Sequence, residues 1–323
     1  MMAGTGLIAP AGEEPVSRSG ASRDRTVSPT SSGQVALAAG LELQRIGDGV
    51  YVIAHRFPFL CNSLLVEMAD GTLVLAGTPC TPEAMQHVLD WTRGHFGERR
   101  IVAINNGYHV DNLGGNRALL DAGIPVHGSD LTVRLLAERG EITRHVVLGF
   151  IPDRDSLEYQ VHATQEFFPP DHIFPASEGL TLVFGGEEVR AICPGPTQAP
   201  DKVLIHFPGR RLLYGGCAVL AGTRAGNTAE ADVGHWAEAL RGMLDLPLDV
   251  VVPAHGERLD PGLLQHTIDL LERHGAAHRP APDFQTRPLD PELTAGGAAC
   301  KAEGSTTWKL RRLAPEDLVG ASA

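Results

Sequence analysis

The feature that most constrains the fold is an order of paired strands followed by helices, which occurs twice along the chain. In the first half, apolar runs at residues 50–56 and 62–77 precede a helical pattern at 81–97. In the second half, hairpin patterns at 180–195 and 202–217 precede further helical segments. Short glycine- or proline-containing turns favour antiparallel pairing. We therefore expect an α+β fold, a four-layer αββα sandwich of two mostly antiparallel sheets with helices on the outer faces.

The helix at 81–97 carries clear boundary signals. Thr81 is the candidate N-cap, Pro82 takes the first helical position, and Gly97 ends the helix. Residues 147–175 are expected to form irregular loops. Other helices are expected at residues 116–123, 130–140, 230–246 and 261–275.

Composition divides the chain into three parts. Residues 1–40 are rich in Ser, Gly, Thr and Pro and are expected to be a disordered leader. Residues 41–278 carry the periodic apolar patterns and should form one domain. Residues 279–323 are rich in Pro, Gly and Ala and are expected to be a loosely structured tail.

Charge and cysteine content limit the classes of partner. The chain has 27 Lys and Arg against 39 Asp and Glu, a net charge of −12, which disfavours nucleic acid and anionic membranes as partners. No apolar run is long enough for a transmembrane helix, and the start lacks the pattern of a secretory signal. Five cysteines without tight spacing argue against a disulfide framework and favour reduced thiols in the cytoplasm.

Metal-ligand residue types follow the ends of three apolar strands. His109 and Asp111 follow "RRIVAINN", Cys217 follows "RRLLYGG", and His255 follows "DVVVPA". Carboxylate, thiolate and imidazole all bind zinc, and three protein ligands with an open fourth position are typical of a catalytic site. Taken singly, a buried cysteine is more often a small core residue, and a lone histidine is more often a hydrogen-bonded surface residue.

The sequence around these residues resembles a known family. "INNGYHVDNLGGN" at 104–116 is similar to the histidine-rich loop of the metallo-β-lactamase superfamily. The stretch from "PPDHIFPASEGL" to "LLYGGC", together with "DVVVPAHGE", resembles the class whose zinc site contains a cysteine. The resemblance covers about residues 45–275 and implies the same αββα fold.

The resemblance implies one complete metal site and one incomplete site. The family's Asp-Cys-His zinc site corresponds to Asp111, Cys217 and His255, all present. The three-histidine site corresponds to positions 107, 109 and 198, and two of its histidines are replaced, by Gly107 and Gln198. We therefore expect one bound zinc ion and a vacant second site.

Further positions depart from the family pattern. The lysine that grips the substrate carboxylate in the family corresponds to Leu220, and Arg224 is the candidate substitute. Asn227 matches an asparagine that polarises the substrate carbonyl, although asparagine after glycine is also a common turn residue. An aspartate that supports the metal loops in the family is replaced by Gly77.

These observations favour a mono-zinc hydrolase acting on a small-molecule substrate. Zinc would activate water to open a cyclic amide such as a β-lactam, or an ester, lactone or thioester. His109, Asp111 and Asn227 are the candidate catalytic residues. The alternative is a catalytically impaired or non-catalytic binding member of the fold, motivated by the missing residues. Redox chemistry on iron would need more carboxylate and histidine ligands than remain. The sequence does not indicate an oligomeric state.

Overall fold

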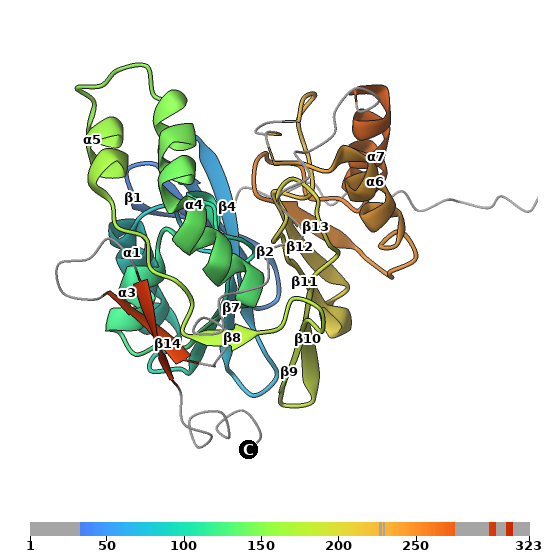
Figure 1. Ribbon diagram of the computed structural model, residues 1–323. Coiled ribbons are helices and arrows are strands. Elements are labelled where there is room, and N and C mark those ends of the chain that lie inside the picture. The colour runs from blue at the N-terminus through green and yellow to red at the C-terminus, as the bar shows by residue number, and fades with distance from the viewer. Residues whose placement is uncertain (1–32, 226–227, 229, 275–296, 302–307, 313–323) are drawn as a thin grey trace, which may run out of the picture.

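The computed structural model describes residues 33–225, 228, 230–274, 297–301 and 308–312. Two sheets pack face to face, with helices on their outer surfaces (Figure 1). This arrangement confirms the predicted α+β sandwich. The hydrophobic side chains between the sheets come from both of them, including Val52 and Leu64 of one and Ile205 and Tyr214 of the other.

Eight strands of the described chain form the larger sheet. The strands from β1 to β5 pair antiparallel, and those from β5 to β8 pair parallel. In spatial order the strands are β1 (Gln34–Ala38), β2 (Leu41–Gly47), β3 (Val50–Arg56), β4 (Leu60–Glu67), β5 (Leu73–Ala76), β6 (Ile101–Ile104), β7 (Val126–Ser129) and β8 (His172–Phe174).

Five strands of the described chain form the smaller sheet. Its strands pair antiparallel except at one edge, where β12 and β13 run parallel. In spatial order they are β13 (Val250–Pro253), β12 (Leu212–Gly216), β11 (Leu204–Phe207), β10 (Glu187–Ile192) and β9 (Leu180–Phe184), and a short 3-10 turn, η1 (Pro208–Arg210), joins β11 to β12.

Helices complete the four layers. The apolar faces of α1 (Pro82–Phe96) and α3 (Asn116–Asp121) cover the larger sheet. The smaller sheet is covered by α6 (Val233–Arg241) and α7 (Gly262–His274), which lie together on its outer side (Figure 1). Among the described residues, no helix combines the length and apolar character needed to cross a membrane.

The boundary signals of α1 act as predicted from the sequence. The Thr81 hydroxyl accepts a hydrogen bond from the main-chain N–H of Ala84, and Pro82 opens the helix. Gly97 ends it with a φ of 73°, a conformation that favours glycine. Met85 and Val88 are buried on the face that packs against the larger sheet.

Three expectations about extent differ from the structure. The ordered domain begins earlier than residue 41, because β1 lies within the range assigned to the leader and pairs with β2. The segment 147–175, expected to be irregular, contains the end of α4 (Asp130–Gly149), which continues through Gly140, and the short strand β8. It also contains α5 (Leu157–Thr164), which begins at a Ser156 cap. The range assigned to the tail contains a hairpin of β14 (Gly297–Lys301) and β15 (Trp308–Arg312). The remaining leader, residues 1–32, lies outside the described residues.

Candidate metal centre

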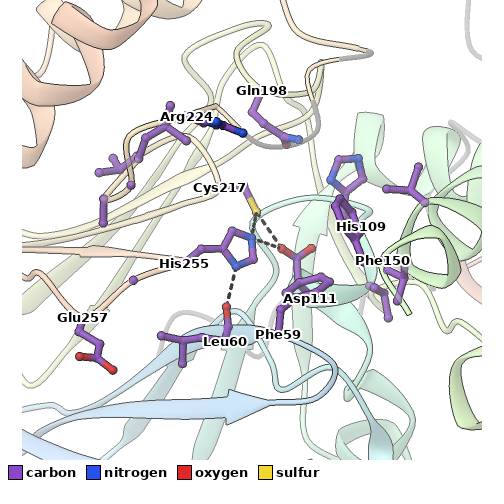
Figure 2. Close-up of a pocket in the computed structure, with 18 of the residues that line it drawn as sticks. Phe59, Leu60, His109, Asp111, Phe150, Gln198, Cys217, Arg224, His255 and Glu257 are labelled. Carbon is purple, nitrogen blue, oxygen red and sulfur yellow. Dashed lines mark hydrogen bonds and ion pairs between the residues drawn. The ribbon is translucent and has the colours of Figure 1, made fainter. Parts of the chain in front are cut away.

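Three strand ends meet at one edge of the sandwich. Asp111 lies in the short helix α2 (Val110–Leu113) that follows β6, while Cys217 and His255 follow the parallel strands β12 and β13. The Cys217 thiol donates to Asp111 Oδ2 at 3.0 Å, and His255 Nε2 lies 3.0 Å from the same oxygen. Cys217 Sγ and His255 Nε2 are 3.9 Å apart. Figure 2 shows all three side chains pointing toward one another.

The spacing of these atoms fits a zinc ion. With zinc–ligand bonds of about 2.0–2.3 Å, a tetrahedral site separates its ligand atoms by roughly 3.3–3.7 Å. The three observed separations, 3.0, 3.0 and 3.9 Å, bracket that range. Because the donors are one carboxylate, one thiol and one imidazole, their chemistry also suits zinc.

The ring of His255 is oriented for ligation by a contact on its far side. Its Nδ1–H donates to the main-chain carbonyl of Leu60 at 2.7 Å, which points Nε2 at Asp111 and Cys217. Burial alone would lower the pKa of His255, but Asp111 and Cys217 raise it well above its ordinary value, so Nε2 holds a proton that a metal ion would displace. Burial alone would raise the pKa of Asp111, but the hydrogen bond and charge of His255, helped by Lys202, hold it well below the ordinary value. Asp111 is therefore ionised at neutral pH, as a metal ligand must be.

Burial and the Asp111 carboxylate raise the pKa of the Cys217 thiol above its ordinary value. Without metal, Cys217 therefore keeps its proton, and the thiol donates a hydrogen bond to Asp111. Binding of a metal ion would release this proton, since the thiolate is the ligand form.

Close backbone packing holds the ligand loops in place. Gly216, directly before Cys217, has a φ of 53°, and a Cβ there would lie 1.8 Å from Asn106 Nδ2, so glycine is required. A Cβ on Gly77 would lie 2.6 Å from the Tyr214 hydroxyl, which donates to the carbonyl of Asn62 at 2.8 Å. Tyr214 thus fills the space beside Gly77, where the family carries an aspartate.

The three ligand-type residues lie in the wall of a cavity of about 540 Å³. Its lining is largely apolar, and Leu220 and Arg224, the two positions considered for substrate binding, are both part of it. The Phe59 ring packs edge-on against the ring of His255 at a centroid distance of 5.5 Å. Asn227, the candidate for polarising a carbonyl, lies outside the described residues. The other apolar side chains of the wall include Val146, Val147, Phe150 and Val219.

The positions of the incomplete three-histidine site also lie together. His109 and Gln198 line the same cavity as the metal-ligand residues. Gly107 faces a side chain that the sequence did not single out, because a Cβ at this glycine would lie 2.8 Å from Lys202 Nζ. The space predicted to be vacant therefore contains the end of Lys202, whose Nζ lies 3.2 Å from His109 Nδ1.

Sequence reasoning missed three residues of this region. The Cys61 thiol belongs to a group with the ligand atoms of Asp111 and His255, all within 4.8 Å of one another. Glu230 contacts the ring of His109, and Lys202 contacts its other side. Neither Cys61, in a buried strand, nor Lys202, just before one, stands at a sequence spacing typical of metal ligands. Only the fold brings them to this region. One signal was available for Lys202, since a lysine beginning an apolar strand must find a buried partner.

The chain is similar to known proteins of one family. A family model described as "Metallo-beta-lactamase superfamily" matches residues 56–255. A "Metallo-beta-lactamase type 2" of Bacillus cereus is 28% identical over 215 residues, covering 65% of this chain and 73% of that protein. A protein of the same description from Bacillus sp. (strain 170) is 27% identical, covering 65% and 72%. The structure of a metallo-beta-lactamase from Pontibacter korlensis has a TM-score of 0.59 and 28% identity, covering 72% of this chain and 99% of that one.

Proposed function

Because the chain belongs to the metallo-β-lactamase superfamily, we propose that it is a zinc-dependent hydrolase that holds one zinc ion on Asp111, Cys217 and His255. One observation carries the proposal. The three ligand atoms lie 3.0–3.9 Å apart in the wall of a cavity of about 540 Å³, large enough for a small organic substrate. Three protein ligands leave a fourth position open, the pattern of catalytic zinc.

A zinc ion bound there would lower the pKa of a water molecule toward neutrality and stabilise negative charge that develops on a substrate oxygen. Asp111 orients the attacking water. Its Oδ2 belongs to the ligand cluster, and its Oδ1, which accepts from Asn112 Nδ2 at 2.8 Å, retains a further lone pair. With its pKa held well below the ordinary value, Asp111 is a weak base and a good acceptor, so it positions the water without taking its proton.

The cavity favours a substrate with an apolar group beside the scissile carbonyl. Phe59 and Phe150 stand in contact at a ring-centroid distance of 5.6 Å on one side, and Leu220 lies in the wall as well. Leu220 supplies no charge for a substrate carboxylate, whereas Arg224 is an exposed guanidinium of the same wall. We propose a cyclic amide, lactone, ester or thioester as the substrate, with its carbonyl directed at the ligand cluster.

The test combines metal counting with a substrate panel. The zinc-loaded chain should contain one zinc ion and hydrolyse at least one of a penicillin, a carbapenem, an aryl lactone and an acyl thioester. A chelator, or Asp111→Asn, should abolish that activity. Asp121→Asn is the matched control, since Asp121 is an exposed carboxylate of α3 paired with Arg117. A chain that binds no zinc when fully folded would refute the proposal.

A non-catalytic zinc-binding protein is the second candidate. It is favoured by the replacement of two histidines, at Gly107 and Gln198, and by the lysine that fills the space beside them. Binding of one zinc ion with no turnover across the panel, together with saturable binding of an intact panel member, would favour this candidate over the hydrolase.

A further inference from the structure

Lys202 is a buried cation with few possible roles. Its side chain is 1% exposed, and it lies just before β11 (Leu204–Phe207) in the chain. A lysine is almost never fully buried without a partner, because desolvating the ammonium is costly. Its Nζ lies 3.2 Å from Nδ1 of His109. A neutral imidazole nitrogen carries one lone pair in the ring plane, so the ammonium donates to the same lone pair that a metal ion would use.

The other nitrogen of His109 is also engaged. His109 Nε2 lies 3.4 Å from Glu230 Oε2, and the carboxylate is further held by Arg139 at 2.9 Å. Burial would raise the pKa of Glu230, but hydrogen bonds from His109 and Tyr108 lower it below the ordinary value. Because Nε2 of His109 faces an ionised carboxylate, we infer that Nε2 carries the ring proton. Nδ1, which faces the ammonium, then accepts a hydrogen bond.

Gly107 and Lys202 are complementary. Gly107 has a φ of +149°, which side chains rarely adopt, and a Cβ there would lie 2.8 Å from Lys202 Nζ and 3.1 Å from its Cδ. A histidine at position 107 would thus need the space that the lysine occupies. Gly107 stands where the three-histidine site has a ligand. The ammonium of Lys202 lies where the side chain of that ligand would begin.

The Asp201 carboxylate lies beside the same glycine as the ammonium. The Asp201 carboxylate accepts from the main-chain N–H of Tyr108 at 2.7 Å and from Thr132 Oγ1 at 2.9 Å, and its other oxygen would lie 3.3 Å from a Cβ on Gly107. Attraction from Lys202 is among the causes that lower the pKa of Asp111. The positive charge therefore reaches the complete ligand set as well as the incomplete one.

We propose that the Lys202 ammonium takes the place of the second metal ion, donating to His109 at the incomplete three-histidine site and excluding a divalent cation from it. This inference rests on the proposed function only for the neighbouring zinc ion. Lys202 is then a positioning residue: it fixes the ring of His109 in the cavity wall and keeps a positive charge beside the zinc site. On this proposal the chain holds a single metal ion for two reasons: two histidines of the second site are absent, and the ammonium occupies the place of the second ion.

The experiment counts zinc ions in four proteins: the native chain, Lys202→Ala, Gly107→His/Gln198→His, and the triple variant with all three changes. Circular dichroism confirms the fold of each. We expect one ion in the native chain and still one in the double variant, because the ammonium remains at His109. The triple variant should bind a second ion. Two ions in the double variant, or one in a folded triple variant, would overturn the inference.

A second measurement keeps the inference testable if the variants do not fold. Nitrogen-15 NMR of the native chain, with His109 assigned through His109→Gln, reports the protonation of each ring nitrogen. We expect a proton on Nε2 and none on Nδ1, unchanged when zinc is added, while His255 shifts. Arg117→Met removes an exposed positive charge and should leave the His109 signals unchanged. A His109 ring that shifts as a ligand would overturn the inference, whereas a native chain without zinc but with this tautomer would refute only the proposed function.

Discussion

Nδ1 of His255 lies 2.7 Å from the main-chain carbonyl oxygen of Leu60, 195 positions earlier in the chain. This contact joins a loop of the smaller sheet to the start of β4 in the larger sheet. It fixes the ring so that Nε2 faces the other two ligand-type side chains. The geometry of the candidate metal centre therefore depends on how firmly the two sheets are joined at this point.

The Asn62 side chain makes further hydrogen bonds between the two sheets at this point. Its side-chain amide donates to the carbonyls of Pro253 at 3.0 Å and Gly256 at 2.8 Å, on both sides of His255. Asn62→Leu leaves these carbonyls without their donor, so the free energy of unfolding should fall by about 2 kcal/mol. Loss of ring orientation should weaken zinc binding about 10-fold or more. Denaturant unfolding and chelator competition measure the two effects.

Ser63→Ala is the matched control for Asn62→Leu. Ser63 is the next buried residue of β4, and its hydroxyl has no hydrogen-bond partner among the described residues. It should leave both stability and zinc affinity nearly unchanged. Equal zinc affinity in Asn62→Leu and the native chain would show that the loop holds His255 without the bridge.

Among the cysteines, replacing Cys217 should cause the largest loss of zinc affinity. Cys217→Ser exchanges a thiolate for a hydroxyl that stays protonated at neutral pH, and affinity should fall more than 10-fold. Cys193→Ser, a change at a half-buried free thiol outside the ligand cluster, should have no effect. Cys61→Ser should cost less affinity than Cys217→Ser if Cys61 lies beside the ion and does not bind it. A larger loss in Cys61→Ser than in Cys217→Ser would move the ligand set to Cys61, Asp111 and His255.

The sequence predicts the packing of sheets and helices better than it predicts where the ordered domain begins and which short elements form. Hairpin turns and capped helices specify two mostly antiparallel sheets with helices outside because these signals are local. The sequence of β1 does not predict a strand, because its five residues are largely exposed at a sheet edge and lack a buried alternation. The eight residues of α5 show little amphipathic pattern, so the Ser156 cap is its one strong local signal.

The ligand-type residues could be predicted because each follows an apolar strand, and strand ends gather at one edge of a sheet. Lys202 could not be predicted in the same way. Its importance comes from the space that Gly107 leaves and from the direction of the His109 ring. Both are tertiary relationships between residues about 95 positions apart, which no local pattern records.

Acid should destabilise the fold partly through His127. Burial and the neighbouring His172 ring, 5.0 Å away, lower the pKa of His127 to about 4. The unfolded chain, with an ordinary pKa near 6.5, binds this proton first as the pH falls. Stability contributed by neutral His127 is therefore complete above about pH 6.5 and is lost progressively toward pH 4, by at most about 3 kcal/mol.

His127→Gln removes this proton-binding group. Relative to the native chain, its unfolding free energy should improve steadily as the pH falls from about 7 to 4.5. His87→Gln, a change at an exposed histidine of α1, serves as the control and should follow the native curve. Parallel curves for His127→Gln and the native chain, measured by urea unfolding at each pH, would exclude His127 as a source of the acid sensitivity.

Substrate choice should depend on the charge at position 220. Leu220 lies in the cavity wall three residues after Cys217, and its main-chain N–H donates to Thr267 Oγ1 at 2.9 Å, so α7 fixes its backbone. Leu220→Lys therefore adds an ammonium at a defined place near the ligand cluster. A charge-assisted hydrogen bond to a substrate carboxylate is worth about 1.5–3 kcal/mol, so kcat/KM for a penicillin should rise about 10-fold or more. An uncharged aryl lactone should gain nothing. Leu220→Met keeps the size without the charge and controls for repacking. If Leu220→Lys and Leu220→Met behave alike toward the penicillin, the carboxylate of that substrate does not approach this wall, and the substrate orientation inferred from the family does not apply to this cavity.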